Sequence, residues 1–211
     1  MKVAIVCSGT VENYDNIKHF FDDAKFIISV DGGASHLKQM GIKPDILVGD
    51  FDSVSSEDYF YFVNQGIEVS KFPAEKDMTD SELAVELAVA KGADEIVFIG
   101  ALGTRMDHSI SNILMLRTLV EKDIKAYIIN EKNEIYMCRN QITIPKKEGS
   151  RLSLIPVTAE AKGVTTKGLK YPLKDATMKL GTSWGVSNEF VWDEATVRVS
   201  EGILLVIVSC D

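Results

Sequence analysis

Residues 44–53 read Pro-Asp-Ile-Leu-Val-Gly-Asp-Phe-Asp-Ser, a short apolar run followed at once by a turn that contains two aspartates. The same order recurs along the first half of the chain. Asp31 lies in Val-Asp-Gly-Gly-Ala-Ser, Asp77 and Asp80 in Lys-Asp-Met-Thr-Asp-Ser, and Asp107 in Gly-Thr-Arg-Met-Asp-His. If the apolar runs are parallel strands, these loops all emerge at the carboxyl end of one sheet, where such folds bind ligands.

Residues 1–130 alternate apolar runs with helical stretches, as α/β architecture requires. The clearest helices are Ser81–Lys91 and His108–Glu121. Thr79 with Glu82 fits a capping box at the start of the first helix, and Gly92 suits its C-terminal end. We therefore predict a Rossmann-like α/β domain over residues 1–130, with a mostly parallel sheet covered on both faces. Its expected strands are Val3–Cys7, Phe26–Val30, Asp45–Val48, Ile67–Ser70, Glu95–Ile99 and Lys125–Ile129.

Residues 131–211 follow a different pattern, with short strands, turn-like connections and no helical period. The connections include Lys146-Lys-Glu-Gly149 and Ser200-Glu-Gly202. This pattern predicts a small all-β sandwich or barrel domain. Its expected strands are Glu134–Cys138, Gln141–Ile144, Leu152–Pro156, Gly163–Thr166, Thr196–Val199 and Ile203–Val208.

Composition narrows the classes of partner. The net charge of −8 argues against nucleic acid, which selects basic surfaces. An acidic protein can still bind ATP when Mg²⁺ and local Lys or Arg side chains offset the repulsion.

The apolar stretches, such as Ile203–Val208, are too short to span a bilayer, and the chain opens on a strand without a signal-peptide pattern. Three widely spaced cysteines indicate free thiols in a reducing cytosol. We expect a cytoplasmic enzyme with no nucleic-acid or membrane partner.

Asp50 and Asp52 flank Phe51, so in an extended backbone both carboxylates would point to the same side. Two such carboxylates repel each other unless a cation lies between them, and hard cations such as Mg²⁺ prefer oxygen ligands. The alternative is that they form turns and cap a helix over residues 55–64. Because several aspartates follow corresponding strands, a metal site is favoured.

Two loops suit phosphate groups. Asp31-Gly32-Gly33 would let a phosphate or ribose approach the backbone, since glycine has no Cβ, although the same tripeptide also suits a simple turn. The longer loop Gly100–His108 supplies Arg105, whose planar fork matches phosphate oxygens. Asp107 and His108 have an alternative reading as residues of the first helical turn. No constellation supports a role for His19 or His36.

In the second domain, Gly181–Phe190 is too polar and glycine-rich for an ordinary strand. Trp184 could offer a flat face to an aromatic or cationic ring, and Ser187 and Asn188 could read hydrogen-bonding edges. The alternative is a structured loop whose tryptophan packs on the neighbouring domain. Chemistry alone does not separate the two.

Taken together, these segments resemble the thiamine pyrophosphokinase (thiamine diphosphokinase) family. The resemblance implies transfer of a pyrophosphoryl group from ATP to thiamine, giving thiamine diphosphate and AMP. It also implies an α/β catalytic domain, a β-domain that binds thiamine, and a homodimer with active sites near the subunit interface. The matching motifs are Asp31–Ala34, Pro44–Ser53, Lys76–Asp80, Gly100–Asn112 and Ser187–Phe190.

The resemblance also implies residue roles. Asp50, Asp52 and Asp80 would bind Mg²⁺, with Asp31 beside them. The thiamine pyrimidine would be held by Ser187 and Asn188, either of the same subunit or of the partner subunit, with Trp184 nearby. The catalytic set would be Asp31, Asp50, Asp52, Asp80, Arg105 and Asp107, and the ATP site would contain Gly32, Gly33, Asp77, Thr79, Arg105 and His108.

One position departs from the family pattern, which usually has Gly-Gly-Arg where this chain has Gly103-Thr104-Arg105. Threonine has less freedom than glycine at positive φ, so the loop conformation is the feature in question. Two rival functions stay open: a pyrophosphokinase for another alcohol, such as a pterin, and a non-catalytic nucleotide- or thiamine-sensing module. The residues do not indicate which carboxylate accepts the proton of the hydroxyl.

Overall fold

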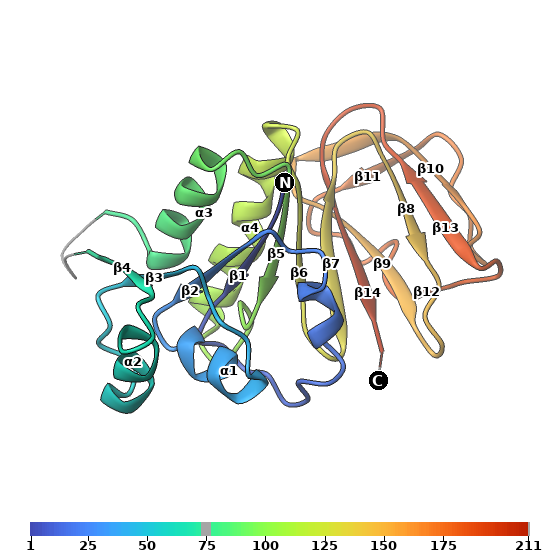
Figure 1. Ribbon diagram of the computed structural model, residues 1–211. Helices are drawn as coiled ribbons and strands as arrows, with labels where there is room; N and C mark the ends of the chain where they lie inside the picture. Colours follow the sequence, from blue (N-terminus) through green and yellow to red (C-terminus); the bar gives the residue numbers. More distant parts are fainter. Residues whose placement is uncertain (73–76, 211) are drawn as a thin grey trace. The chain divides into compact units, whose positions relative to one another are not determined.

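The computed structural model describes residues 1–72 and 77–210, which form two compact units (Figure 1). The first unit comprises Met1–Met115 and Asp123–Glu131, and the second comprises Leu116–Lys122 and Lys132–Asp211. Helix α4, Met106–Glu121, therefore contributes its last turns to the second unit. The predicted boundary at residue 130 instead places the whole of this helix in the first domain.

The sheet of the first unit has six parallel strands in the order β6-β5-β1-β2-β3-β4. The chain moves from β1 toward β4 on one side and then adds β5 and β6 on the other. The carboxyl ends of β1 and β5 therefore flank a topological switch point, where open α/β sheets bind ligands. The bounds are β1 Lys2–Val6, β2 Phe26–Val30, β3 Ile46–Gly49, β4 Glu68–Lys71, β5 Glu95–Ile99 and β6 Lys125–Ile129.

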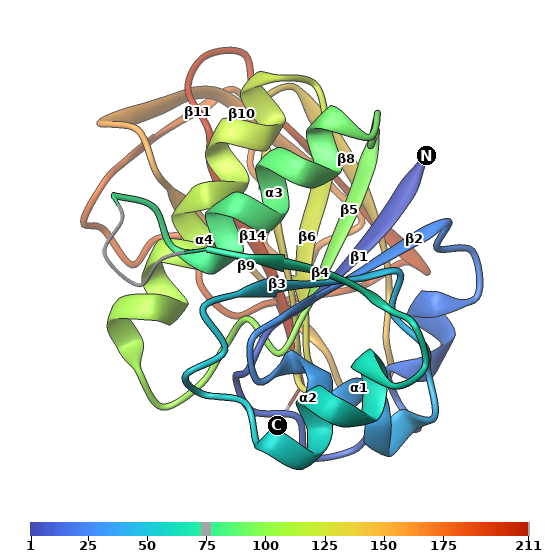
Figure 2. The ribbon, with the colours of Figure 1, turned by 60° about the vertical axis from the view of Figure 1, so that its left-hand side comes forward.

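Helices cover both faces of this sheet. Helices α1, Gly33–Met40, and α2, Ser56–Val63, lie on one face, and α3, Asp80–Ala90, lies on the other with the start of α4 beside it (Figure 2). A 3-10 turn, η1, spans Lys18–Phe21. Because both faces are covered, four consecutive residues of β1, from Val3 to Val6, are almost fully buried. The prediction of a doubly covered, mostly parallel sheet is confirmed.

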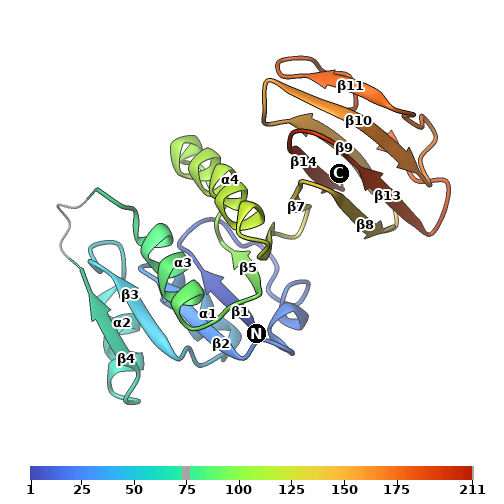
Figure 3. The ribbon, with the colours of Figure 1, turned by 90° about the horizontal axis from the view of Figure 1, so that it is seen from above.

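The second unit is an antiparallel β-sandwich (Figure 3). One set of strands pairs in the order β12-β9-β14-β7 and the other in the order β11-β10-β13-β8. Their inner faces bury an apolar core that includes Leu154, Val164, Met178, Val197 and Val206. The bounds are β7 Asn133–Cys138, β8 Gln141–Pro145, β9 Arg151–Pro156, β10 Glu160–Lys167, β11 Ala176–Lys179, β12 Asn188–Glu189, β13 Glu194–Arg198 and β14 Leu204–Ser209.

Most predicted elements are present with ends shifted by one or two residues. Strands β11 and β12 were not predicted, because both are short and polar and owe their pairing to the neighbouring strands. Capping by Thr79 is confirmed: its Oγ1 accepts a hydrogen bond from the backbone N–H of Glu82 at 3.2 Å. Within the described chain, every helix falls short of the length and hydrophobicity that a bilayer crossing needs.

Candidate active site

A cavity of about 600 Å³ opens at the carboxyl end of the first unit's sheet. Its walls come from the loops after β1, β2, β3 and β5 and from the first residues of α3 and α4. Both loops at the switch point contribute, so the cavity lies where the topology predicts a ligand site. The lining includes Ser8–Thr10, Asp31, Asp50, Asp52, Ser53, Met78–Ser81, Ala101–Arg105, His108, Ser109 and Asn112.

Three carboxylates converge in this cavity. Asp31, Asp50 and Asp80 each place one oxygen so that the three oxygens lie within 4.8 Å of one another. They come from the ends of β2 and β3 and from the first residue of α3, so only the folded sheet brings them together. An oxygen-only set with this spacing is the donor chemistry that a hard divalent cation such as Mg²⁺ requires.

Within this cluster, Asp31 has a raised pKa. Burial raises the pKa of Asp31 to about 7, together with repulsion from Asp80 and, to a smaller extent, from Asp50 and Asp52. Its Oδ1 accepts a hydrogen bond from the backbone N–H of Phe51 at 3.2 Å, which acts in the opposite direction. A bound cation would remove the cause of the mutual repulsion.

Asp52 lies in the cavity wall but outside the group of three converging oxygens. The backbone between Asp50 and Asp52 is not extended as expected, because Phe51 has a φ of 65°, although both residues line the cavity. The backbone N–H of Asp52 instead donates to Asp50 Oδ1 at 3.0 Å. Asp31, which was expected beside the metal ligands, takes the third place in the cluster.

Arg105 and His108 line the cavity, and Asp107 lies next to both. Arg105 Nη2 is 2.6 Å from Asp107 Oδ2, and His108 Nε2 is 3.9 Å from the same oxygen. The hydrogen bond from Arg105 lowers the pKa of Asp107. The side chains of Arg105 and Asp107 are 70% and 66% exposed, so the guanidinium can exchange this partner for a phosphate at little cost.

The loop after β5 is held by two side chains that were not assigned a role from the sequence. Ser109 Oγ accepts from the N–H of Gly103 at 3.0 Å, and the buried Asn112 donates its Nδ2 to the carbonyl of Ala101 at 2.9 Å. Thr104 is absent from the described non-glycine residues that have positive φ, so threonine fits this loop without backbone strain.

Ser8-Gly9-Thr10 is a cavity segment that the sequence reasoning missed. Its signal was available, since it follows the first apolar run just as the aspartate loops follow theirs. It lacks a carboxylate, the group on which the prediction of a metal site depended.

The other residues predicted to bind the nucleotide differ in their position relative to the cavity. Thr79 lines the cavity, whereas Asp77, Gly32 and Gly33 do not belong to its described lining. A Cβ at Gly33 would lie 2.7 Å from the carbonyl carbon of Val6, so this glycine lets α1 pack closely on the end of β1. Lys76, the first residue of the Lys-Asp-Met-Thr-Asp motif, lies outside the described residues.

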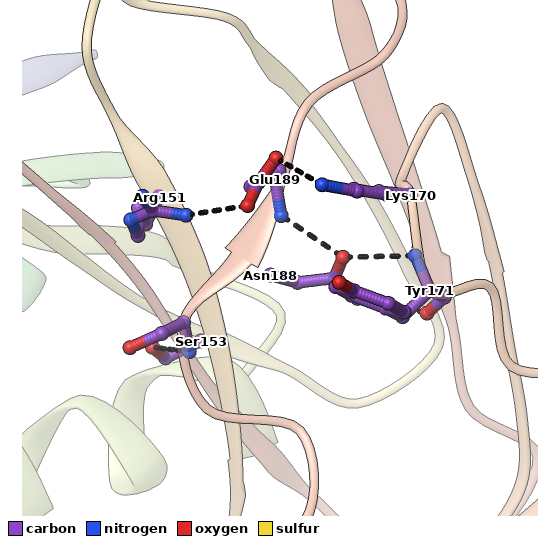
Figure 4. Close-up of polar contacts among 7 residues, drawn as sticks. Arg151, Ser153, Lys170, Tyr171, Asn188 and Glu189 are labelled. Atoms are coloured by element: carbon purple, nitrogen blue, oxygen red, sulfur yellow. Dashed lines mark hydrogen bonds and ion pairs between the residues drawn. The ribbon is translucent and has the colours of Figure 1, made fainter.

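In the second unit, Asn188 joins two segments through its side-chain amide (Figure 4). Its Oδ1 accepts from the backbone N–H groups of Tyr171 and Glu189 at 3.1 and 2.9 Å, and its Nδ2 donates to the Tyr171 carbonyl at 2.8 Å. Glu189 forms ion pairs with Arg151 and Lys170, both at 2.9 Å. The amide of this buried residue thus holds the strand in place.

The two other predicted thiamine residues belong to the loop before β12. Ser187 has a φ of 60° and donates its backbone N–H to Ser153 Oγ at 2.9 Å. Trp184 is 54% exposed, and the carbonyl of the next residue, Gly185, accepts from Leu154 N at 2.9 Å. The segment is therefore an ordered loop with its indole at the surface.

Comparison with known proteins places both units in one family. Residues 17–128 match the family model "Thiamin pyrophosphokinase, catalytic domain", and residues 139–204 match "Thiamin pyrophosphokinase, vitamin B1 binding domain". A thiamine pyrophosphokinase of Bacillus subtilis is 33% identical over 211 residues, covering 99% of each chain. The crystal structure of a thiamine pyrophosphokinase from Bacillus subtilis has a TM-score of 0.91 at 31% identity and covers 100% of both chains. That of a thiamin pyrophosphokinase from Geobacillus thermodenitrificans has a TM-score of 0.87 at 30% identity and covers 100% of this chain and 98% of its own.

The α/β unit with its acidic cavity and the β-sandwich unit define a two-part enzyme of the pyrophosphokinase class. The chain belongs to the thiamine pyrophosphokinase family.

Proposed function

We propose that this chain transfers the pyrophosphoryl group of ATP to the hydroxyethyl group of thiamine, giving thiamine diphosphate and AMP. The observation that carries the proposal is the convergence of three carboxylates in a cavity at the switch point. The match of residues 139–204 to a vitamin B1 binding domain supports thiamine as the acceptor. In the reaction the hydroxyl oxygen of thiamine forms a bond to the β-phosphorus of ATP. The bond between the β-phosphorus and the oxygen that bridges it to the α-phosphorus breaks, and AMP leaves with the bridging oxygen.

Mg²⁺ is the proposed cofactor. The donor set fits it, because Asp31, Asp50 and Asp80 supply only carboxylate oxygens at close spacing. When bound, the ion would offset the charge of the triphosphate and of the carboxylates. Asp52 was predicted as a ligand as well, and we propose that it supports the site through its hydrogen bond with Asp50.

The residues around the cluster would hold the nucleotide. Arg105 would exchange Asp107 for phosphate oxygens, while Thr79 and His108 border the same space. Phosphoryl transfers depend mostly on positioning and on neutralising oxygen charge, which are the contributions this set can make. A carboxylate near the hydroxyl would take its proton as the new bond forms.

The second unit would present thiamine. We propose that Ser187 and Trp184 contact the pyrimidine, with Asn188 keeping the strand in register through Tyr171.

A homodimer and a cytoplasmic location complete the proposal. Met106, Ile110 and Leu114 form an exposed apolar row at i, i+4 and i+8 on α4, which suits a subunit contact, and the three free thiols suit a reducing compartment.

One assay separates this proposal from its rivals. The protein is incubated with ATP, Mg²⁺ and either thiamine or a pterin alcohol, and the products are resolved by liquid chromatography. AMP with thiamine diphosphate supports the proposal. ADP indicates ordinary phosphoryl transfer, turnover of a pterin alcohol alone indicates the other acceptor, and no turnover indicates a sensing module.

The role of Asp80 is tested in the same assay. Asp80→Asn keeps the shape of the side chain and removes its charge, so turnover should fall by about two orders of magnitude or more in a folded protein. The matched control is Asp22→Asn, an exposed residue outside the cavity, which should leave turnover unchanged. Near-normal turnover by folded Asp80→Asn would exclude Asp80 from the metal site.

A further inference from the structure

The cavity segment Ser8–Thr10 is held along one side by the loop after β5. Gly9 donates its N–H to the carbonyl of Gly100 at 2.6 Å, and Thr10 donates to the carbonyl of Leu102 at 2.8 Å. A Cβ at Gly9 would lie 2.9 Å from the carbonyl carbon of Leu102, so the two loops are in direct contact. These two bonds use the N–H groups of Gly9 and Thr10, and the carbonyl of Gly9 has a different partner.

That partner is His36, which projects from α1. Its Nε2 lies 2.8 Å from the Gly9 carbonyl oxygen. The same ring also borders the second loop, since a Cβ at Gly100 would lie 3.4 Å from His36 Cδ2. The imidazole is thus hydrogen-bonded to one loop of the switch-point wall and lies beside the other, although His36 is outside the described lining of the cavity.

The other ring nitrogen is also occupied. Tyr14 OH lies 2.9 Å from His36 Nδ1, and the two rings have centroids 5.8 Å apart. The turn that carries Tyr14 is anchored by Glu131, whose Oε1 accepts from the backbone N–H groups of Glu12 and Asn13. Glu131 thus holds the turn that precedes Tyr14, and Tyr14 and His36 form a chain of hydrogen bonds that ends at the Gly9 carbonyl.

The protonation of the ring follows from its partners. A carbonyl oxygen can only accept, so Nε2 carries the proton and Nδ1 accepts from the tyrosine hydroxyl. Burial lowers the pKa of His36, which keeps the ring neutral at physiological pH and favours this single tautomer. The imidazole is then a rigid spacer with a donor at one end and an acceptor at the other.

We propose that His36, oriented by Tyr14, is a positioning residue for nucleotide binding, because it holds Gly9 and thereby the Ser8–Thr10 wall in the conformation that receives the phosphates of ATP. The inference rests on the proposed function in that it takes MgATP as the occupant of this cavity. A purely structural histidine would affect stability alone, whereas a positioning histidine affects the affinity for MgATP and leaves the affinity for thiamine unchanged.

The test measures MgATP binding by calorimetry in the absence of thiamine, alongside steady-state kinetics. His36→Phe keeps a ring and removes the donor, so the Kd for MgATP should rise roughly tenfold, the effect of one lost hydrogen bond. The KM for ATP should rise in parallel, with kcat and the KM for thiamine within about twofold of the wild-type values. His36→Gln places an amide N–H at the reach of Nε2 and should restore most of the affinity.

Two further variants complete the test. Tyr14→Phe removes only the hydroxyl and should raise the Kd roughly threefold, which decides the matter if His36→Phe does not fold. The matched control is His19→Phe, which changes an exposed histidine outside the described cavity lining and should bind MgATP as the wild type does. Thermal unfolding of each variant establishes that it is folded.

The outcomes are distinct. Wild-type affinity in folded His36→Phe, or a loss in His36→Gln as large as that in His36→Phe, overturns the inference while leaving the proposed function intact. A wild-type protein that does not bind MgATP overturns the proposed function and this inference with it.

Discussion

The carboxylate of Asp31 lies against the α-carbon of Gly49, in the space where any other residue would carry its Cβ. A Cβ at that position would overlap Asp31 Oδ1 and lie 2.7 Å from its Cγ. Gly49 also has a φ of 146°, which side chains rarely allow. The last residue of β3 must therefore be glycine for Asp31 to reach the acidic cluster.

Gly49→Ala should accordingly displace Asp31 and lower kcat at least tenfold, with loss of Mg²⁺-dependent stabilisation. AMP release and thermal unfolding with and without MgCl₂ measure the two effects. Gly66→Ala is the matched control: Gly66 has a φ of 75° but open space around it, so this variant strains the backbone without touching the site. Equal activity losses in the two variants would contradict the assignment.

The raised pKa of Asp31 predicts a pH-dependent stability in the absence of metal. The folded value of about 7 exceeds the ordinary value of 3.8, so between these pH values the folded state binds the extra proton. This group therefore lowers the free energy of unfolding progressively as pH rises through that window, and its penalty is complete above about pH 7. Because Asp31→Asn removes the penalty, the Tm difference between variant and wild type should grow from pH 5 to pH 8.

Mg²⁺ should reverse this trend, since a bound cation favours the ionised carboxylate. The rise in Tm on adding MgCl₂ to the wild type should therefore increase from pH 5 to pH 8 and should be smaller and flatter in Asp31→Asn. Asp22→Asn serves as the control and should follow the wild type. A Mg²⁺ effect that does not vary with pH would show that Asp31 is not in the cation site.

Thr79 combines a helix cap with a place in the cavity, and the two roles can be separated. Thr79→Ala should lower the free energy of unfolding by about 1 kcal/mol, measured by urea denaturation, and should also raise the KM for ATP. Ser55 caps α2 in the same way by accepting from Asp58 N at 3.1 Å, but it lies outside the cavity lining. Ser55→Ala should match the stability loss without the change in KM, and an unchanged KM in Thr79→Ala would leave Thr79 as a cap alone.

Asn188→Ala should be destabilising because it removes three hydrogen bonds at a buried position. The expected loss is about 2 kcal/mol in the free energy of unfolding, since the N–H and carbonyl of Tyr171 lose their partner. The KM for thiamine should rise while the KM for ATP stays near the wild-type value. Arg151→Ala, which removes one exposed ion pair from the same strand segment, should change stability little, and a comparable loss there would argue against the amide as the main support.

Local pattern predicted most of the secondary structure because burial and backbone periodicity act over a few residues. Phe26–Val30 and Glu95–Ile99 were predicted with the bounds that the structure has, since each is a fully covered apolar strand. β12, Asn188–Glu189, was missed because it is a polar strand of two residues, which pairs with β9 without any run of apolar residues.

The site was predictable as a set of loops but not as a geometry. The structure brings Asp31 and not Asp52 together with Asp50 and Asp80, and it gives Phe51 a positive φ; no local pattern indicates either feature. His36 was left without a role for a similar reason: its partners, Gly9 and Tyr14, are more than twenty residues away in sequence.

The sequence by itself determined the two-part architecture, the loops that carry the chemistry and the family resemblance, because these depend on residue type and order. Only the tertiary structure decided which carboxylates meet, which glycine admits them and which histidine supports the cavity wall. The physical reason is that the sheet brings the ends of β1, β2, β3 and β5 to one edge, where distances of a few ångströms set both the pKa of Asp31 and the space for a cation.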